Sequence, residues 1–248
     1  MFTTPISQAR INRPRPDLAP LNIDMAGSIT ENLRRIRRAV PEEVALVAVS
    51  KFHPVEALSE AYAAGQRIFG ESRALELEAK AAALPGDIEW HFIGHLQTNK
   101  VKKVVACAAM IHSVDSPRLL EAIDSEARKT GRRPGVLLQL HVAREETKFG
   151  FTPDELLAFV TPELVAAMSG VEFRGVMGMA SNVDDETRIR SDFREIRGVF
   201  DRLRSTVFAD SPAFDTVSMG MSHDWPLAVE EGSTMVRVGT SIFGEREY

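Results

Sequence analysis

The chain has 248 residues, a length that suits one large domain, and its 44% apolar and 26% charged residues are ordinary for a globular protein. Its net charge of −5 argues against a general nucleic-acid-binding surface, and its single cysteine excludes an internal disulfide framework and fits a reducing compartment. No apolar run approaches the roughly 20 residues that a membrane-spanning helix needs, and the first residues lack the apolar core of a secretory signal, so we expect a cytoplasmic protein without a membrane partner.

The N-terminal segment and the first helix differ clearly in pattern. Residues 1–27 contain several prolines and arginines without an apolar period, so we expect a mobile, partly extended tail. Ser28 and Glu31 then form a capping box, which predicts the start of a helix. Neither a linker nor a low-complexity segment interrupts residues 28–248, and we interpret them as one domain.

After this first helix, short apolar runs alternate with helical patterns. We expect strands at residues 44–50, 67–70, 90–94, 110–114, 136–142, 172–179, 214–219 and 235–239. Helical patterns fall between them, at residues 54–64, 72–83, 97–106, 116–130, 153–169, 184–208 and 222–231. Eight strands alternating with helices over about 220 residues are typical of an α/β protein with a single (β/α)8 TIM barrel, and a doubly wound open sheet is the alternative. In a barrel, functional residues lie at the carboxyl ends of the strands.

The last two predicted strands both end in small and hydroxyl-bearing residues. Gly220 and Ser222 follow the seventh strand, and Gly239 and Thr240 lie at the end of the eighth. In barrels, the loops at these two positions often bind a phosphate through backbone amides and a helix N-terminus. Each segment alone is equally well explained as a tight turn with a capping serine. Together, at consecutive strand ends, the two segments favour an anion site.

Lys51 occupies an unusual position, at the end of the apolar strand VALVAVSK. In a closed barrel the first strand lies next to the eighth, so Lys51 would lie beside the predicted anion site. Apolar neighbours disfavour the charged form of a lysine, and the neutral amine can form a Schiff base with a carbonyl. The alternative is a lysine that extends out of the barrel mouth into water. A Schiff-base lysine beside a phosphate site indicates either a phosphorylated aldehyde cofactor or an aldolase substrate.

Several segments of the chain resemble the pyridoxal phosphate homeostasis proteins. These are single-domain barrels similar to the N-terminal domain of alanine racemase, the type III fold of pyridoxal-phosphate proteins. The likeness runs from about residue 28 to residue 244. It is carried by VAVSK (47–51), FGE (69–71), WHFIGHLQTNKVKKV (90–104), IHSVD (111–115), SMGMSHD (218–224) and VRVGTSIFG (236–244).

The resemblance implies a binding site for pyridoxal 5'-phosphate (PLP). It implies that Lys51 holds PLP as a Schiff base and that six further residues contact it: Ser222, Gly239 and Thr240 at the phosphate, Ser218 and Met221 along the wall, and Arg237 at the pyridine nitrogen. An arginine cannot accept the ring proton, so the pyridine stays largely unprotonated and is a weak electron sink.

Two positions depart from the family pattern, and two histidines invite a metal interpretation. Ser72 follows Glu71 where the family usually has asparagine, so we interpret Ser72 as a helix N-cap. His141 also replaces an asparagine, and we expect it only to line the mouth. His91 and His95 are spaced as a metal pair on a helix would be, but within a strand they lie about 13 Å apart. We therefore expect no metal site.

Three hypotheses for function remain: a carrier that supplies or buffers PLP, a PLP-dependent racemase, and an aldolase that uses Lys51 on a phosphorylated sugar. A racemase needs a second base opposite the lysine, which in alanine racemase is a tyrosine from a separate C-terminal domain of the partner chain. Here Tyr62 falls in a crossover helix away from the mouth, and Tyr248 follows directly after the last strand, so we expect that base to be missing. We predict a non-enzymatic, monomeric carrier in PLP homeostasis, without a catalytic residue, that contacts apo PLP-dependent enzymes transiently. Weak racemase activity is the alternative.

Overall fold

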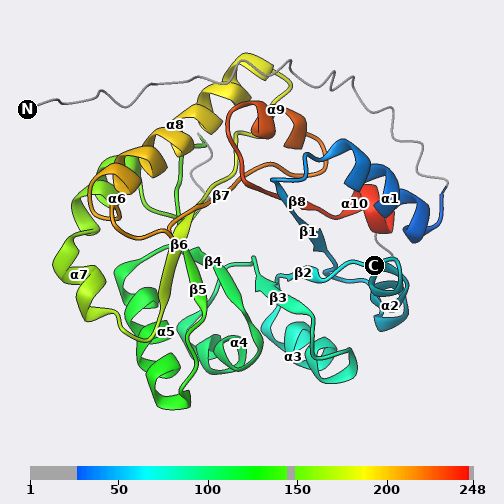
Figure 1. Cartoon of the computed structure of the whole chain (residues 1–248), viewed down its shortest axis with the longest axis horizontal. Helices are drawn as coiled ribbons and strands as arrows, with labels where there is room; N and C mark the ends of the chain where they lie inside the picture. Colours follow the sequence, from blue (N-terminus) through cyan, green and yellow to red (C-terminus); the bar gives the residue numbers. More distant parts are fainter. Residues whose placement is uncertain (1–26, 144–148, 246–248) are drawn as a thin grey trace, which may run out of the picture.

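The structure is a computed structural model and describes residues 27–143 and 149–245. Eight parallel strands form a closed barrel in sequence order, and the helices pack around its outside (Figure 1). The strands are β1 Ala45–Val49, β2 Ile68–Glu71, β3 Glu89–Phe92, β4 Met110–Val114, β5 Gly135–Gln139, β6 Glu172–Met177, β7 Thr216–Ser218 and β8 Met235–Val238. All eight predicted strands are confirmed, and the pairing of β1 with β8 closes the barrel and excludes an open sheet. The predicted tail lies, except for Gly27, outside the described residues.

The helices follow the predicted order with two differences. They are α1 Ile29–Ala39, α2 Val55–Ala63, α3 Ala74–Ala83, the 3-10 helix η1 Thr98–Lys100, α4 Val101–Cys107, α5 Pro117–Thr130, α6 Pro153–Phe159, α7 Pro162–Ala167, α8 Glu186–Ser205, α9 Trp225–Glu230 and α10 Thr240–Phe243. The capping box of Ser28 and Glu31 is confirmed at α1. The single helix predicted over 153–169 is wrong, because Thr161 caps a new helix that starts at Pro162. The sequence pattern does not reveal α10. None of the helices in the described ranges is both long and apolar enough to cross a membrane.

Two apolar clusters hold the barrel together. The larger lies between the strands and the helices, where Leu33 and Ile36 of α1 and Phe193 and Ile196 of α8 are fully buried. Each such side chain contributes about 2 kcal/mol by leaving water. The smaller cluster fills the interior of the barrel, and we call it the apolar layer: Val47, Met110, Leu137, Met177 and Met235.

A second set of inward-facing side chains lies above the apolar layer, toward the carboxyl ends of the strands. Side chains alternate between the two faces of a strand, so residues two apart on one strand fill successive layers. His112 follows Met110 in this way, and Arg237 follows Met235. We call the buried residues at this level the polar layer: His91, His112, Ser218 and Arg237. The interior therefore changes from apolar to polar as the strands approach their carboxyl ends.

Candidate functional site

A pocket of about 250 Å³ lies at the carboxyl ends of the strands, and we call it the mouth pocket. Its lining includes six of the seven residues that the sequence predicts to bind the cofactor: Lys51, Met221, Ser222, Arg237, Gly239 and Thr240. The sequence reasoning did not assign the remaining lining residues to the site: Val49, Ser72, Ile93, Met179 and His223. Val49, Ile93 and Met179 could have been found, because each lies at or just beyond the carboxyl end of an apolar strand.

Ser218, the seventh predicted residue, lies beneath the pocket rather than in its wall. Its side chain is fully buried in the polar layer. The Nη1 atom of Arg237 donates to the Ser218 hydroxyl at 2.6 Å and to its carbonyl at 2.8 Å, while Nη2 donates to the carbonyl of Gly178 at 3.1 Å. Ser218 thus fixes the direction of Arg237, and its predicted contact with the cofactor stays a prediction.

Arg237 brings a buried positive charge to the mouth pocket. Desolvation lowers its pKa to about 10, and the charge of Asp224 acts in the opposite direction. With this pKa the guanidinium stays charged at neutral pH. In the described part of the chain, its hydrogen-bond acceptors are neutral oxygens. A buried guanidinium whose hydrogen-bond acceptors are neutral oxygens favours an anionic or electron-rich ligand above it.

A chain of hydrogen bonds continues from Arg237 into the barrel interior. His112 Nδ1 lies 3.1 Å from Ser218 Oγ, and His112 Nε2 lies 2.9 Å from His91 Nδ1. Burial lowers the pKa of His91 to about 3 and the pKa of His112 well below its ordinary value, so both imidazoles are neutral near pH 7. A neutral imidazole has one donor and one acceptor, which suits a continuous chain. The sequence does not reveal this chain of hydrogen bonds, because His91, His112 and Ser218 lie on three different strands.

The two segments predicted to form an anion site meet directly. Gly220 has a φ of +95°, and a Cβ atom there would clash with α9, so glycine is required at this turn. The Asp224 carboxylate accepts a hydrogen bond from the Met221 amide at 2.6 Å and so closes the turn after β7. Ser222 Oγ then accepts a hydrogen bond from the Gly239 amide at 3.2 Å. Hydroxyl and amide groups from the ends of β7 and β8 thus gather at one place, where α10 begins.

Ser72 reaches the mouth pocket because its backbone is packed against the loop after β3. Arg73, not Ser72, is the N-cap residue of α3, and it makes no side-chain capping bond. A Cβ atom on Gly94 would lie only 2.3 Å from the Ser72 carbonyl oxygen, so this close approach requires glycine. The N-cap interpretation of Ser72 is therefore wrong, and the residue belongs to the pocket lining.

Two other histidines, His95 and His141, are not among the residues that line the mouth pocket. Strand β3 ends before His95, whose Nδ1 lies 2.9 Å from the Asp115 carboxylate, so its placement within a strand is wrong. His141 is outside the mouth-pocket lining, contrary to expectation. Across residues 27–143 and 149–245, no group of three or more histidine, cysteine or acidic side chains is arranged to hold a metal ion.

A larger cavity of about 620 Å³ lies beside the mouth pocket, between α3 and the segment around η1. It shares Ser72 with the mouth pocket and is also lined by Leu75, Glu76, His95 and Lys100. Its lining contains neither Lys51 nor the hydroxyls at the ends of β7 and β8. Because those groups carry the predicted chemistry, we assign the functional site to the smaller mouth pocket.

Comparison with known proteins agrees with this geometry. Residues 25–247 match the family model described as alanine racemase, N-terminal domain. The pyridoxal phosphate homeostasis protein of Vibrio alginolyticus is 39% identical over 213 residues, covering 84% of this chain and 89% of the relative. The Homo sapiens protein of the same name is 38% identical over 225 residues, covering 87% of this chain and 81% of the relative.

Solved structures show the same relationship. PipY of Synechococcus elongatus PCC7942, solved with PLP bound, is 41% identical with a TM-score of 0.79, and the match covers 87% of this chain and all of PipY. Alanine racemase of Bartonella henselae is 19% identical with a TM-score of 0.66, covering 91% of this chain and 62% of the racemase, a likeness of fold alone. The chain therefore belongs to the pyridoxal phosphate homeostasis protein family, which is built on the barrel of the alanine racemase N-terminal domain.

Proposed function

We propose that this chain binds PLP in the mouth pocket, holds it on Lys51, and supplies or buffers it in the cell without turning over a substrate. One observation carries the proposal: the Lys51 side chain shares a 250 Å³ pocket with Ser222, Gly239 and Thr240. PLP supplies an aldehyde, which condenses with a primary amine to a Schiff base with loss of one water, and a phosphate group. The family name and the PLP-bound structure of PipY support this choice of cofactor.

The groups at the ends of β7 and β8 fit a phosphate. The Ser222 hydroxyl and the Gly239 amide lie 3.2 Å apart, close enough for one phosphate oxygen to contact both. Thr240 adds a hydroxyl at the first residue of α10. A Cβ atom on Gly239 would lie 3.1 Å from the Val49 carbonyl oxygen, which leaves little room for a larger residue. Small residues here keep the backbone amides accessible to an anion.

Arg237 explains why this site would hold a cofactor without driving a reaction. We propose that its guanidinium donates a hydrogen bond to the pyridine nitrogen. Because the pKa of Arg237 remains near 10, it neither gives up its proton to the ring nor accepts one from it at neutral pH. The ring nitrogen then stays unprotonated and withdraws little charge from a substrate carbon.

Racemase-type proton exchange is a second candidate function, and the position of His223 in the lining of the mouth pocket favours it. The imidazole of this residue is a side chain that can act as a general acid or base. Tyr62, in contrast, donates its hydroxyl to Asp87 at 2.7 Å, at the end of α2 away from the mouth. Deuterium exchange at the α-carbon of several amino acids, measured with PLP-saturated protein, separates the two functions. A carrier shows no multiple-turnover exchange, whereas a racemase shows exchange that His223→Ala removes.

We also propose that the protein is monomeric and contacts apo PLP-dependent enzymes only transiently. Large exposed apolar side chains are few in the described ranges, namely Leu75, Phe149 and Val183, and this supports a monomer. Light scattering during gel filtration tests it. A single species near 27.4 kDa agrees with the proposal, and a stable dimer contradicts it.

The absorbance spectrum of purified protein after addition of PLP tests the proposed function. Wild-type protein should develop a visible band, and Lys51→Ala should abolish it, because the band requires the Lys51 amine. Lys100→Ala is the matched control, since Lys100 lines only the adjacent cavity and its loss should leave the band unchanged. A protein that stays colourless with PLP would instead favour an aldolase or another use of Lys51.

A further inference from the structure

The residue after Lys51 has a strained backbone. Phe52 has a φ of +68°, and within residues 27–143 and 149–245 it is the only residue other than glycine with a positive φ. This left-handed conformation is uncommon for a bulky side chain. Such strain persists where surrounding contacts over-determine the backbone, and it concentrates at functional sites. The contacts of residues 50–52 therefore bear on how Lys51 is presented to the pocket.

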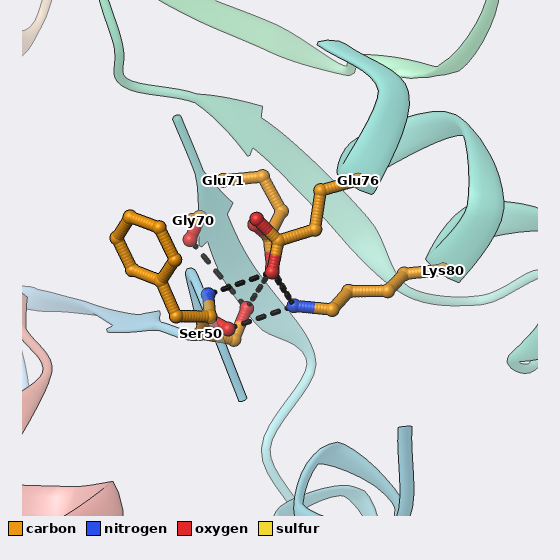
Figure 2. A network of polar contacts seen from close by, with 6 residues as sticks. Ser50, Gly70, Glu71, Glu76 and Lys80 are labelled. Carbon is orange, nitrogen blue, oxygen red and sulfur yellow. Dashed lines mark hydrogen bonds and ion pairs between the residues drawn. The ribbon is translucent and has the colours of Figure 1, made fainter. Parts of the chain in front are cut away.

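Three charged side chains beside Lys51 make those contacts, and we call them the Lys80 cluster: Glu71 of β2, and Glu76 and Lys80 of α3. Figure 2 shows Glu71, Glu76 and Lys80 converging on the end of the first strand. Lys80 Nζ donates to one carboxylate oxygen of Glu71 and one of Glu76, both at 2.7 Å. The same nitrogen donates to the carbonyl oxygen of Ser50 at 2.8 Å.

The Lys80 cluster holds the chain on both sides of Lys51. On one side, the Ser50 hydroxyl donates to Glu71 at 2.6 Å, in addition to the bond between the Ser50 carbonyl and Lys80. On the other side, the Phe52 amide donates to Glu76 at 2.6 Å. The guanidinium of Arg73, at the start of α3, also lies 4.3 Å from the centre of the Phe52 ring. The strained turn that carries Lys51 is thus anchored to β2 and α3.

The buried ion pair of Glu71 and Lys80 is not explained by a contribution to the stability of the fold. Glu71 is fully buried and Lys80 is 5% exposed. Desolvation of two such ions largely cancels their attraction, so buried ion pairs are often replaceable by apolar residues without loss of stability. Burial also raises the pKa of Glu71, despite its contact with Lys80. What the ions achieve here is directional: they fix backbone groups of the residues before and after Lys51.

We propose that the Lys80 cluster is a positioning element for Lys51, which holds residues 50–52 so that the lysine amine is directed into the mouth pocket. This inference rests on the proposed function of Lys51. Without the Lys80 cluster, Phe52 relaxes out of the left-handed conformation and the amine loses its fixed approach to the cofactor. The cofactor is then released faster, although the barrel remains folded.

A pair of substitutions at Glu76 tests the proposal most sharply. Glu76→Leu removes the acceptor for the Phe52 amide, whereas Glu76→Gln keeps an amide oxygen of the same reach. We expect Glu76→Leu to release PLP about tenfold faster, an effect comparable to losing a residue that orients a metal ligand. The release rate of Glu76→Gln should stay near that of the wild type. Release is followed as the loss of visible absorbance when PLP-loaded protein is mixed with an excess of an apo PLP-dependent enzyme.

A second readout separates positioning from a merely structural role. The pH at which the visible band changes depends on the surroundings of the Lys51 nitrogen, and it should shift in Glu76→Leu but not in Glu76→Gln. Asp124→Asn is the matched control: Asp124 is a buried carboxylate on α5 that accepts from the Gly170 amide at 2.7 Å, away from the mouth. Its substitution should change the melting temperature and leave release and the band unchanged.

The outcomes distinguish this inference from the proposed function. A wild-type release rate and an unchanged band in Glu76→Leu would overturn the positioning role while leaving Lys51 as the anchor, as would equal behaviour of the Leu and Gln variants. A wild-type protein without a Lys51-dependent band would overturn the proposed function itself. If Glu76→Leu does not fold, the double variant Glu71→Gln/Lys80→Met removes the buried ion pair and the bond from Lys80 to the Ser50 carbonyl, and we expect faster release there as well.

Discussion

The β1 side and the β7–β8 side of the mouth pocket are both backed by buried polar groups, but the two sets differ in charge. Behind Lys51, the Lys80 cluster joins one ammonium to two carboxylates. Behind Ser222 and Gly239, the polar layer ties the Arg237 guanidinium to neutral partners. The side that presents an amine is therefore positioned by a lysine shared between two glutamates, while the side proposed to face the phosphate and the ring holds a guanidinium bonded to neutral partners.

When the pH falls, the contributions of the two sides to the free energy of unfolding should change in opposite directions. The pKa of Glu71 is raised by burial, so its contribution to stability is complete below its ordinary pKa of 4.5 and is lost as the pH rises through the raised value. The pKa of His91 is lowered to about 3, so its contribution is present above 6.5 and is lost as the pH falls toward 3. Acidification thus weakens the polar layer while favouring the protonated form of Glu71.

The largest effect should come from removing the charge on the β7–β8 side. Arg237→Met removes the guanidinium, and we expect the affinity for PLP to fall about 100-fold, as for loss of a hydrogen bond with a charged group. Equilibrium titration of the visible band measures the affinity. Arg197→Met is the control, because Arg197 lies on α8 and binds the Gly232 carbonyl outside the pocket. An Arg237→Met affinity within twofold of wild type would contradict a contact between Arg237 and the cofactor.

The pH dependence of stability should also differ between the two sides of the pocket. Between pH 7 and pH 5, His91 alone should lower the free energy of unfolding by about 2 kcal/mol, because the unfolded chain binds a proton that the folded chain does not. Urea unfolding at both pH values measures this loss. In His91→Gln the loss should shrink, and in Glu71→Gln it should grow. If the wild type, His91→Gln and Glu71→Gln all lose the same free energy of unfolding between these pH values, the two sides do not differ in their response to acid.

A smaller effect should come from the hydroxyl at the predicted phosphate site. Ser222→Ala should weaken PLP binding about tenfold, since one hydrogen bond to a charged group is lost. Binding of pyridoxal, which lacks the phosphate, should be the same in Ser222→Ala and wild type. If the substitution weakens both ligands equally, Ser222 acts on the shape of the loop and not on the phosphate.

Much of the fold follows from local sequence signals. The eight strands are visible as apolar runs because both faces of a barrel strand are buried. The break at Thr161–Pro162 also had a local signal, a capping threonine before a proline at the first helical position, which the periodic pattern over 153–169 obscured. Helix α10 has only four residues and is too short for any period to reveal.

The residues of the site also divide into those that have a local sequence signal and those that have none. Lys51, Ser222, Arg237 and Gly239 could be predicted because function in a barrel lies at the strand ends, and the structure brings them into one pocket. The Lys80 cluster could not, since ALELEAKAAA reads as an ordinary surface helix and its partners lie on other elements. The contact of His112 with Ser218 was hidden for the same reason: it joins residues 106 positions apart in the sequence.

Chemical reduction of the loaded protein shows directly whether Lys51 carries the cofactor. PLP-loaded protein is treated with borohydride, which makes the bond between amine and cofactor permanent, and is then digested and analysed by peptide mass spectrometry. We expect the added mass of the reduced cofactor on the peptide that contains Lys51, and no such mass in Lys51→Ala. The added mass on another lysine, such as Lys80 or Lys100, with Lys51 unmodified, would contradict it.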